Sequence, residues 1–135
     1  MHKIKLIVLY LICFSLLGFG QVNDKPIVII TQDGEVDDKS SFVRFLLYTS
    51  DIDLRGIIAT NSIWQKNGHG IEWIQEAIAL YGKVHSNLLI HNKHYPTVDY
   101  LKSITILGNE DPKYLKGGAP YTDSKGSDLI VSELL

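Results

Sequence analysis

An apolar segment, an acidic turn and an amphipathic helical pattern follow one another without a gap near the start of this chain. Residues 26–30 read Pro-Ile-Val-Ile-Ile, and residues 31–38 read Thr-Gln-Asp-Gly-Glu-Val-Asp-Asp. The following residues place Phe42, Phe45 and Leu46 on one side of a helix. Because a continuous apolar run is typical of a parallel strand covered on both faces, the pattern predicts a strand, a tight turn at Gly34 and a helix.

A second strand is predicted soon after this helix, which makes the start of the chain a βαβ unit. The fold class predicted is α/β, with a Rossmann-like parallel sheet and flanking helices. The predicted elements are a strand at 26–31, a helix at 38–49, a strand at 54–60, a helix at 70–83, a short third strand at 87–90, a helix capped by Thr97, a surface loop at 109–118 and a final helix opened by Asp128.

Four carboxylates lie within six residues of the acidic turn: Asp33, Glu35, Asp37 and Asp38. Acidic residues favour the first turn of a helix, so Asp37 or Asp38 could serve only as a helix cap. Alternatively, the carboxylates of Asp33, Asp37 and Asp38 could converge on a hard cation such as Ca²⁺, which binds oxygen ligands. The spacing does not match the twelve-residue EF-hand loop.

The chain has 135 residues and a formal net charge of −2, which gives it no basic field to attract nucleic acid. Lysines at positions 3 and 5 precede an apolar run at 6–17 and small residues at 18 and 20. This pattern predicts a signal peptide at 1–20, cleaved before Gln21, and hence a secreted or periplasmic protein without a stable membrane span after cleavage. A retained N-terminal anchor is the alternative. The only cysteine, Cys13, lies in this segment, so the mature chain would contain no disulfide.

Other residues that could carry chemistry lie after the second strand. The polar loop at 61–70 should face the acidic turn, since the carboxyl ends of parallel strands share one edge of the sheet, and it carries His69. Trp64 in this loop could stack on a sugar or base ring, or pin the loop to the core. His91 and His94 are three residues apart, a spacing that on a helix could hold zinc, but buried or surface roles fit an extended segment better.

The strand followed by Asp33, and by the pair Asp37 and Asp38, resembles the N-terminal signature of the nucleoside hydrolases. The chain is more similar still to secreted bacterial proteins described as cellulose-binding with a nucleoside-hydrolase-like domain. That similarity covers residues 33–41, Asn87-Leu88 with His91, Tyr95-Pro96 and Gly126-Ser127. Residues 21–135 would then be the N-terminal portion of such a domain, because the final helical pattern stops without a closing glycine.

The resemblance implies a role for each matching residue. Asp33 would be a calcium ligand and the base that activates water, and Asp38 would be a second calcium ligand. Asp37 and Asn61 would bind the sugar of the substrate. The reaction implied is hydrolysis of the N-glycosyl bond of a ribosyl-type substrate by a calcium-assisted water.

Two departures from the nucleoside hydrolases leave alternatives open. Asp33-Gly34-Glu35 replaces the usual Asp-Pro-Gly turn, and the later ligands of that family belong to a C-terminal half that this sequence does not contain. The same fold could therefore serve as a non-catalytic secreted polysaccharide-binding protein, or the chain could be a truncated, inactive reading frame. The partner expected is a small glycoside or a polysaccharide.

Overall fold

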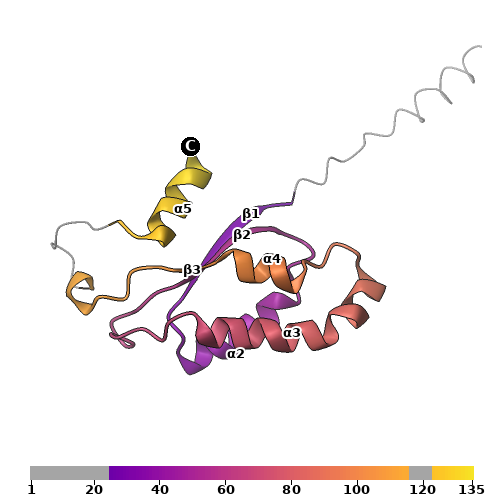
Figure 1. The fold of residues 1–135 in the computed structure, drawn as a ribbon, viewed down its shortest axis with the longest axis horizontal. Helices are drawn as coiled ribbons and strands as arrows, with labels where there is room; N and C mark the ends of the chain where they lie inside the picture. The colour runs from indigo at the N-terminus through magenta and orange to yellow at the C-terminus, as the bar shows by residue number, and fades with distance from the viewer. Residues whose placement is uncertain (1–24, 116–122) are drawn as a thin grey trace, which may run out of the picture.

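The structure is a computed structural model that describes residues 25–115 and 123–135. A parallel three-stranded sheet, in the order β1-β2-β3, runs through its centre (Figure 1). β1 is Ile27–Gln32, β2 is Asp53–Ala59 and β3 is Thr105–Leu107. The predicted α/β class with a parallel sheet is confirmed, and the first two predicted strands differ from the observed ones by a single residue at each end.

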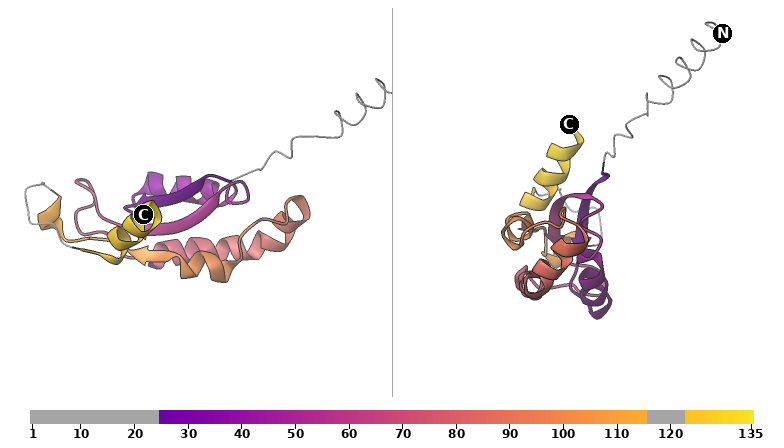
Figure 2. Two further views of the ribbon diagram at one scale, coloured as in Figure 1. Left: turned by 90° about the horizontal axis from the view of Figure 1, so that it is seen from above. Right: turned by 90° about the vertical axis from the view of Figure 1, so that its right-hand side faces the viewer.

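Helices α2 (Val36–Leu46) and α3 (Glu72–His91) lie on one side of the sheet, and α4 (Val98–Ser103) packs against α3 (Figures 1 and 2). Because the strand order follows the chain order, right-handed crossovers place both connecting helices on the same face. The core on this face consists of buried residues from the sheet and all three helices: Phe42, Leu46, Leu54, Ile57, Ala59, Ile74, Ile78, Tyr81 and Leu101.

The opposite face of the sheet carries α5 (Lys125–Leu134) (Figure 1). This helix approaches the sheet closely through Gly126, where a Cβ would lie 2.7 Å from Ile58 Cγ2. The sequence predicted that Asp128 opens this helix, but the cap is Ser124, whose hydroxyl accepts a hydrogen bond from Ser127 N at 3.1 Å. Asp128 lies within the first turn.

The prediction of a third strand at 87–90 is wrong, because these residues belong to the last turns of α3. Leu88 continues the buried stripe that Ile78 and Tyr81 begin, so the short apolar run belongs to a helix. At Gly82 of α3, a Cβ would lie 2.9 Å from Val98 Cγ2, so the lack of a side chain there lets α4 approach α3.

The third strand lies instead directly after α4. Thr97 caps α4 as predicted, because its side chain accepts a hydrogen bond from Tyr100 N at 3.1 Å. The helix ends at Ser103 rather than including Ile104, and Thr105–Leu107 then pairs with β2. A strand of three residues has too few positions for a recognisable alternation of apolar and polar side chains.

The remaining sequence predictions concern loops and the N-terminal segment. The described part of the predicted surface loop, up to Leu115, contains a short 3₁₀ helix at Pro112–Tyr114. Gly117 and Gly118, the signal peptide at 1–20 and Cys13 lie outside the described residues. Within the described ranges, no helix combines the length and the apolar character needed to cross a membrane.

Candidate functional site: an acidic turn at the carboxyl edge of the sheet

The acidic turn joins β1 to α2 at the carboxyl end of the parallel strands. Oδ2 of Asp38 accepts hydrogen bonds from the backbone N–H groups of Asp33, at 2.6 Å, and Gly34, at 3.1 Å. Oδ1 of Asp33 accepts a hydrogen bond from Glu35 N at 3.2 Å. Gly34 adopts a φ of +81°, a conformation that side chains other than glycine rarely adopt. The carboxylates of Asp33 and Asp38 therefore hold the turn closed and lie next to each other.

Helix capping does not explain this arrangement. α2 begins at Val36, and the preceding Glu35 makes no capping bond through its side chain. Asp38 accepts from amides of the turn rather than from amides of the helix, so it is not an N-cap, although Asp37 and Asp38 both lie in the first turn of α2. Its negative charge in the first helical turn is still favoured by the helix dipole.

The two aspartates influence each other's ionisation in opposite directions. The hydrogen bond with Asp38 lowers the pKa of Asp33, and a hydrogen bond from the Ser62 side chain lowers it further. Partial removal from water, reinforced by the neighbouring Asp33 carboxyl, raises the pKa of Asp38. In the absence of a cation, Asp38 therefore takes up a proton before Asp33 does, and Asp33 remains the anionic partner.

The loop after β2 faces the acidic turn, as predicted. Thr60 N donates to Gln32 O at 2.8 Å, which joins the ends of the two strands. A Cβ on Gly34 would lie 2.9 Å from both His69 Cδ2 and Trp73 Nε1. Gly34 thus permits the loop and the start of α3 to pack directly against the turn.

Asp37 lies apart from the Asp33–Asp38 pair, on the exposed side of the turn. Together with Glu35, Gln65 and His69 it lines an open hollow of about 680 Å³. Partial desolvation and the neighbouring aspartate charges raise the pKa of Glu35, while His69 lowers it. Of the three carboxylates expected to converge, those of Asp33 and Asp38 meet, whereas that of Asp37 lines a separate hollow.

Asn61 lies directly beyond the end of β2, two residues after Ala59. Its Nδ2 donates to Lys66 O at 2.8 Å, so the side-chain amide stabilises its own loop. Two further residues, which the sequence patterns did not single out, shape this edge. Ser62 donates to Asp33, and Glu110 accepts a hydrogen bond from Gly70 N at 2.9 Å through Oε1. Ser62 could have been found from its place in the facing loop, whereas nothing near Glu110 in the sequence points to this contact.

Trp64 is 79% exposed, so it does not pin its loop to the core. Trp73, in contrast, meets Phe42 edge to face with ring centroids 5.7 Å apart and packs against the core. His85 lies beside Tyr81, with its Nε2 3.4 Å from Tyr95 O. His91 and His94 are exposed, but His91 is the last residue of α3, so the expectation of an extended segment is wrong at that position.

The acidic turn suits a hard cation in the kind of its ligands. Asp33 and Asp38 would contribute two of the six to eight oxygen ligands that Ca²⁺ takes. Gln32, one residue before Asp33, has a buried side-chain oxygen, Oε1, without a hydrogen-bond partner, and a side-chain carbonyl is also a ligand for this ion. Among the described residues, no group of three or more His, Cys, Asp or Glu side chains is arranged to hold a metal ion. The described residues thus bring together two carboxylates, fewer than the ligands that calcium takes.

Comparison with known proteins assigns the chain to a family. A family model described as "Cellulose-binding Sde182, nucleoside hydrolase-like domain" matches residues 27–135. A solved structure of a nucleoside hydrolase-related hypothetical protein from Saccharophagus degradans, associated with carbohydrate metabolism, matches with a TM-score of 0.71 and 31% sequence identity. The match covers 82% of this chain and 27% of that protein's chain. A search of curated protein sequences gives no match.

Proposed function

Because this chain belongs to the family of cellulose-binding Sde182 nucleoside hydrolase-like domains, we propose that its acidic turn forms part of a calcium-assisted site that hydrolyses N-glycosyl bonds of ribosyl-type substrates. The observation that carries the proposal is the pairing of Asp33 and Asp38 at the carboxyl edge of the sheet. Ligands in open α/β sheets bind at this edge. Two carboxylates held side by side are costly unless a proton or a cation lies between them.

The proposed reaction breaks the bond between the anomeric carbon of the sugar and the nitrogen of the base. The oxygen of a water molecule bonds to that carbon, the electron pair of the broken bond leaves with the base, and the base gains a proton. Asp33 would orient the water and accept its proton, while Asp38 would keep Asp33 in place through the two amides of the turn. Asp37, on the adjoining hollow, would hold a sugar hydroxyl. Bound calcium would lower the pKa of the attacking water.

Base release from a panel of N-ribosides, measured with calcium and with a chelator, tests this proposal. A full-length protein that contains this domain should release base only with calcium, and Asp33→Asn in it should lower the rate by about 100-fold or more, since general base catalysis typically contributes 10²–10⁴. Asp99→Asn is the matched control, because Asp99 also lies in the first turn of a helix, α4, away from the acidic turn. Absence of turnover across the panel with calcium present would contradict the proposal.

A second candidate function, binding of a polysaccharide without catalysis, is favoured by the exposure of Trp64. An indole ring that is 79% exposed, next to Ile63 at 59%, offers a flat apolar surface on which a sugar ring can stack. On this proposal the loop at 61–70 would hold insoluble cellulose, and the carboxylates of the turn would be dispensable.

Retention on insoluble cellulose separates the two candidates. If binding is the function, retention should survive Asp33→Ala and be lost in Trp64→Ala. Trp64 contacts little of the fold, so this substitution should leave stability unchanged within about 0.5 kcal/mol. Retention that is equal in the wild type and Trp64→Ala would end this second candidate.

Either function would suit an exported protein, and the pattern at residues 1–20 supports export. The mass of the mature protein from the culture medium or periplasm should correspond to a chain that starts at Gln21. A mass that includes residues 1–20 would contradict cleavage.

A further inference from the structure

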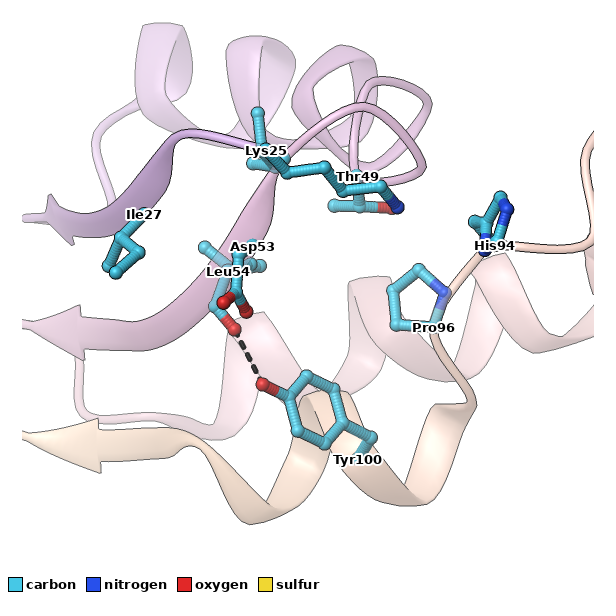
Figure 3. Close-up of a pocket in the computed structure, with 9 residues that line it drawn as sticks. Lys25, Ile27, Thr49, Asp53, Leu54, His94, Pro96 and Tyr100 are labelled. Carbon is cyan, nitrogen blue, oxygen red and sulfur yellow. Dashed lines mark hydrogen bonds between the residues drawn. The ribbon is translucent and has the colours of Figure 1, made fainter. Parts of the chain in front are cut away.

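A cavity of about 590 Å³ lies at the opposite, amino edge of the sheet (Figure 3). It is bounded by Lys25 before β1, by Asp53 at the start of β2, by His94 and Pro96 between α3 and α4, and by Tyr100 of α4. Ile27, Thr49, Ile52 and Leu54 complete its lining. Its volume is in the range typical of small-molecule sites.

Three tyrosine hydroxyls hold the walls of this cavity in place, each by donating to a backbone carbonyl of another segment. Tyr100 donates to Leu54 O at 2.7 Å, Tyr81 to Pro96 O at 2.8 Å and Tyr95 to Leu47 O at 2.9 Å. These bonds join α3 and α4, and the connection between them, to β2 and to the end of α2. The cavity is therefore part of the folded framework, and a ligand would find it already formed.

The polar groups of the cavity include both signs of charge. Asp53 N donates to Pro26 O at 2.9 Å, which places Lys25 beside the start of β2. One oxygen of the Asp53 carboxylate, Oδ2, is paired with Arg55 at 2.7 Å. Lys25 and Asp53 enter the same lining, and the Lys25 side chain extends toward Thr49 in Figure 3. Because Arg55 pairs with only one oxygen of this carboxylate, the lining keeps a hydrogen-bond donor at Lys25 and an acceptor at Asp53 for a ligand.

An aromatic ring and a proline complete the recognition surface. Tyr100 is 39% exposed, and its ring stands beside the cavity while its hydroxyl is held by Leu54 O. The C–H face of a sugar ring packs on such an aromatic surface, and the sugar hydroxyls need both donors and acceptors nearby. We propose that this cavity binds a short stretch of a neutral glucan chain. The choice of a glucan relies on the polysaccharide-binding candidate above, whereas the location of the site does not.

Titration of the ¹⁵N-labelled full chain with cellotriose, followed by amide chemical shifts, tests the proposal. The shifts should concentrate at Ile52, Leu54 and Tyr100, and Asp53→Asn should weaken binding by about tenfold, the effect of losing a charge-assisted hydrogen bond. Asp51→Asn is the matched control, because Asp51 is exposed on the same edge and does not line the cavity. The chemical-shift changes of the wild type test the location of the site even if a variant folds poorly.

The outcomes separate this site from the others. Shifts confined to Trp64 and its loop would overturn the cavity proposal and leave the Trp64 candidate intact. Shifts at the cavity lining with inorganic phosphate, but none with cellotriose, would overturn it in favour of an anion. Cavity shifts with cellotriose in a chain that releases no base from N-ribosides would support the cavity and contradict only the hydrolase proposal.

Discussion

The two edges of the sheet are built in different ways. At the carboxyl edge, the acidic turn is closed by residues that lie within five positions of one another, through hydrogen bonds from Asp33 N and Gly34 N to Asp38. At the amino edge, the cavity is closed by tyrosine hydroxyls that reach across 15 to 48 positions in the chain. One edge depends on local turn geometry, and the other depends on the packing of distant segments. Each edge should therefore fail under a different substitution.

The largest effect is expected from Phe42→Ala, because Phe42 is fully buried in the core that supports both edges. Removing its ring, which contacts Phe45 and Trp73, should lower the free energy of unfolding by about 3–5 kcal/mol. Urea denaturation measures the change. Val43→Ala on the exposed side of α2 is the control and should cost far less. A small loss for Phe42→Ala would show that the core does not join the two edges.

Gly34→Ala should disturb the carboxyl edge alone. The positive φ of Gly34 costs other residues about 1–2 kcal/mol, and a Cβ would also approach His69 and Trp73 to 2.9 Å. We expect a loss of about 2 kcal/mol or more in unfolding free energy, with amide shifts concentrated around the acidic turn and the loop at 61–70. Equally large changes in the amide chemical shifts of Tyr100 and of the residues next to Pro96 would contradict the separation of the edges.

Tyr81→Phe should disturb the amino edge alone. The substitution keeps the ring but leaves the Pro96 carbonyl without its donor, at a cost of about 1–2 kcal/mol. The buried hydroxyl belongs to a phenol whose pKa is raised to about 12 by removal from water. The expected amide shifts surround Thr49, Pro96 and His94. As a control, Tyr48→Phe alters an exposed ring and should leave both edges unchanged.

The smallest effect is expected from pH. The raised pKa of Asp38 stabilises the folded state at low pH, and this contribution is lost as the pH rises through the raised value. The lowered pKa of Asp33 stabilises the folded state above the ordinary aspartate value, and this contribution is lost as the pH falls through the lowered value. Without calcium, the pair should therefore contribute most near about pH 4.

Urea denaturation at several pH values, without divalent ions, measures this contribution. Asp38→Asn should flatten the maximum in the unfolding free energy as a function of pH, because the side-chain amide imitates the protonated carboxyl at every pH. A profile that is the same in the wild type and in Asp38→Asn would contradict the coupling of the two aspartates.

The difference between the edges also explains how much the sequence could predict. The strand, turn and helix around Asp33 are contiguous, so their apolar pattern and the glycine were enough to place the turn at the carboxyl edge. Loop 61–70 was predicted to face the turn from strand order alone. The sequence could not show whether the Asp37 carboxylate meets those of Asp33 and Asp38. The direction of the Asp37 side chain depends on where α2 begins, and α2 begins at Val36.

The failures lie where tertiary packing decides the structure. The helix α3 continues past its predicted end at residue 83 to His91, where Leu88 packs against the core, a contact that no local pattern shows. The short strand β3 forms because it can pair with β2. The cavity at the amino edge was missed altogether, since its residues come from distant segments and only the tyrosine hydroxyl bonds bring them together.

Calorimetric titration of the chain with Ca²⁺ tests the central claim most directly. The claim predicts saturable calcium binding that is lost in both Asp33→Asn and Asp38→Asn and kept in Asp99→Asn. If the two substitutions at the acidic turn leave calcium binding unchanged, the pairing of Asp33 and Asp38 serves only to close the turn.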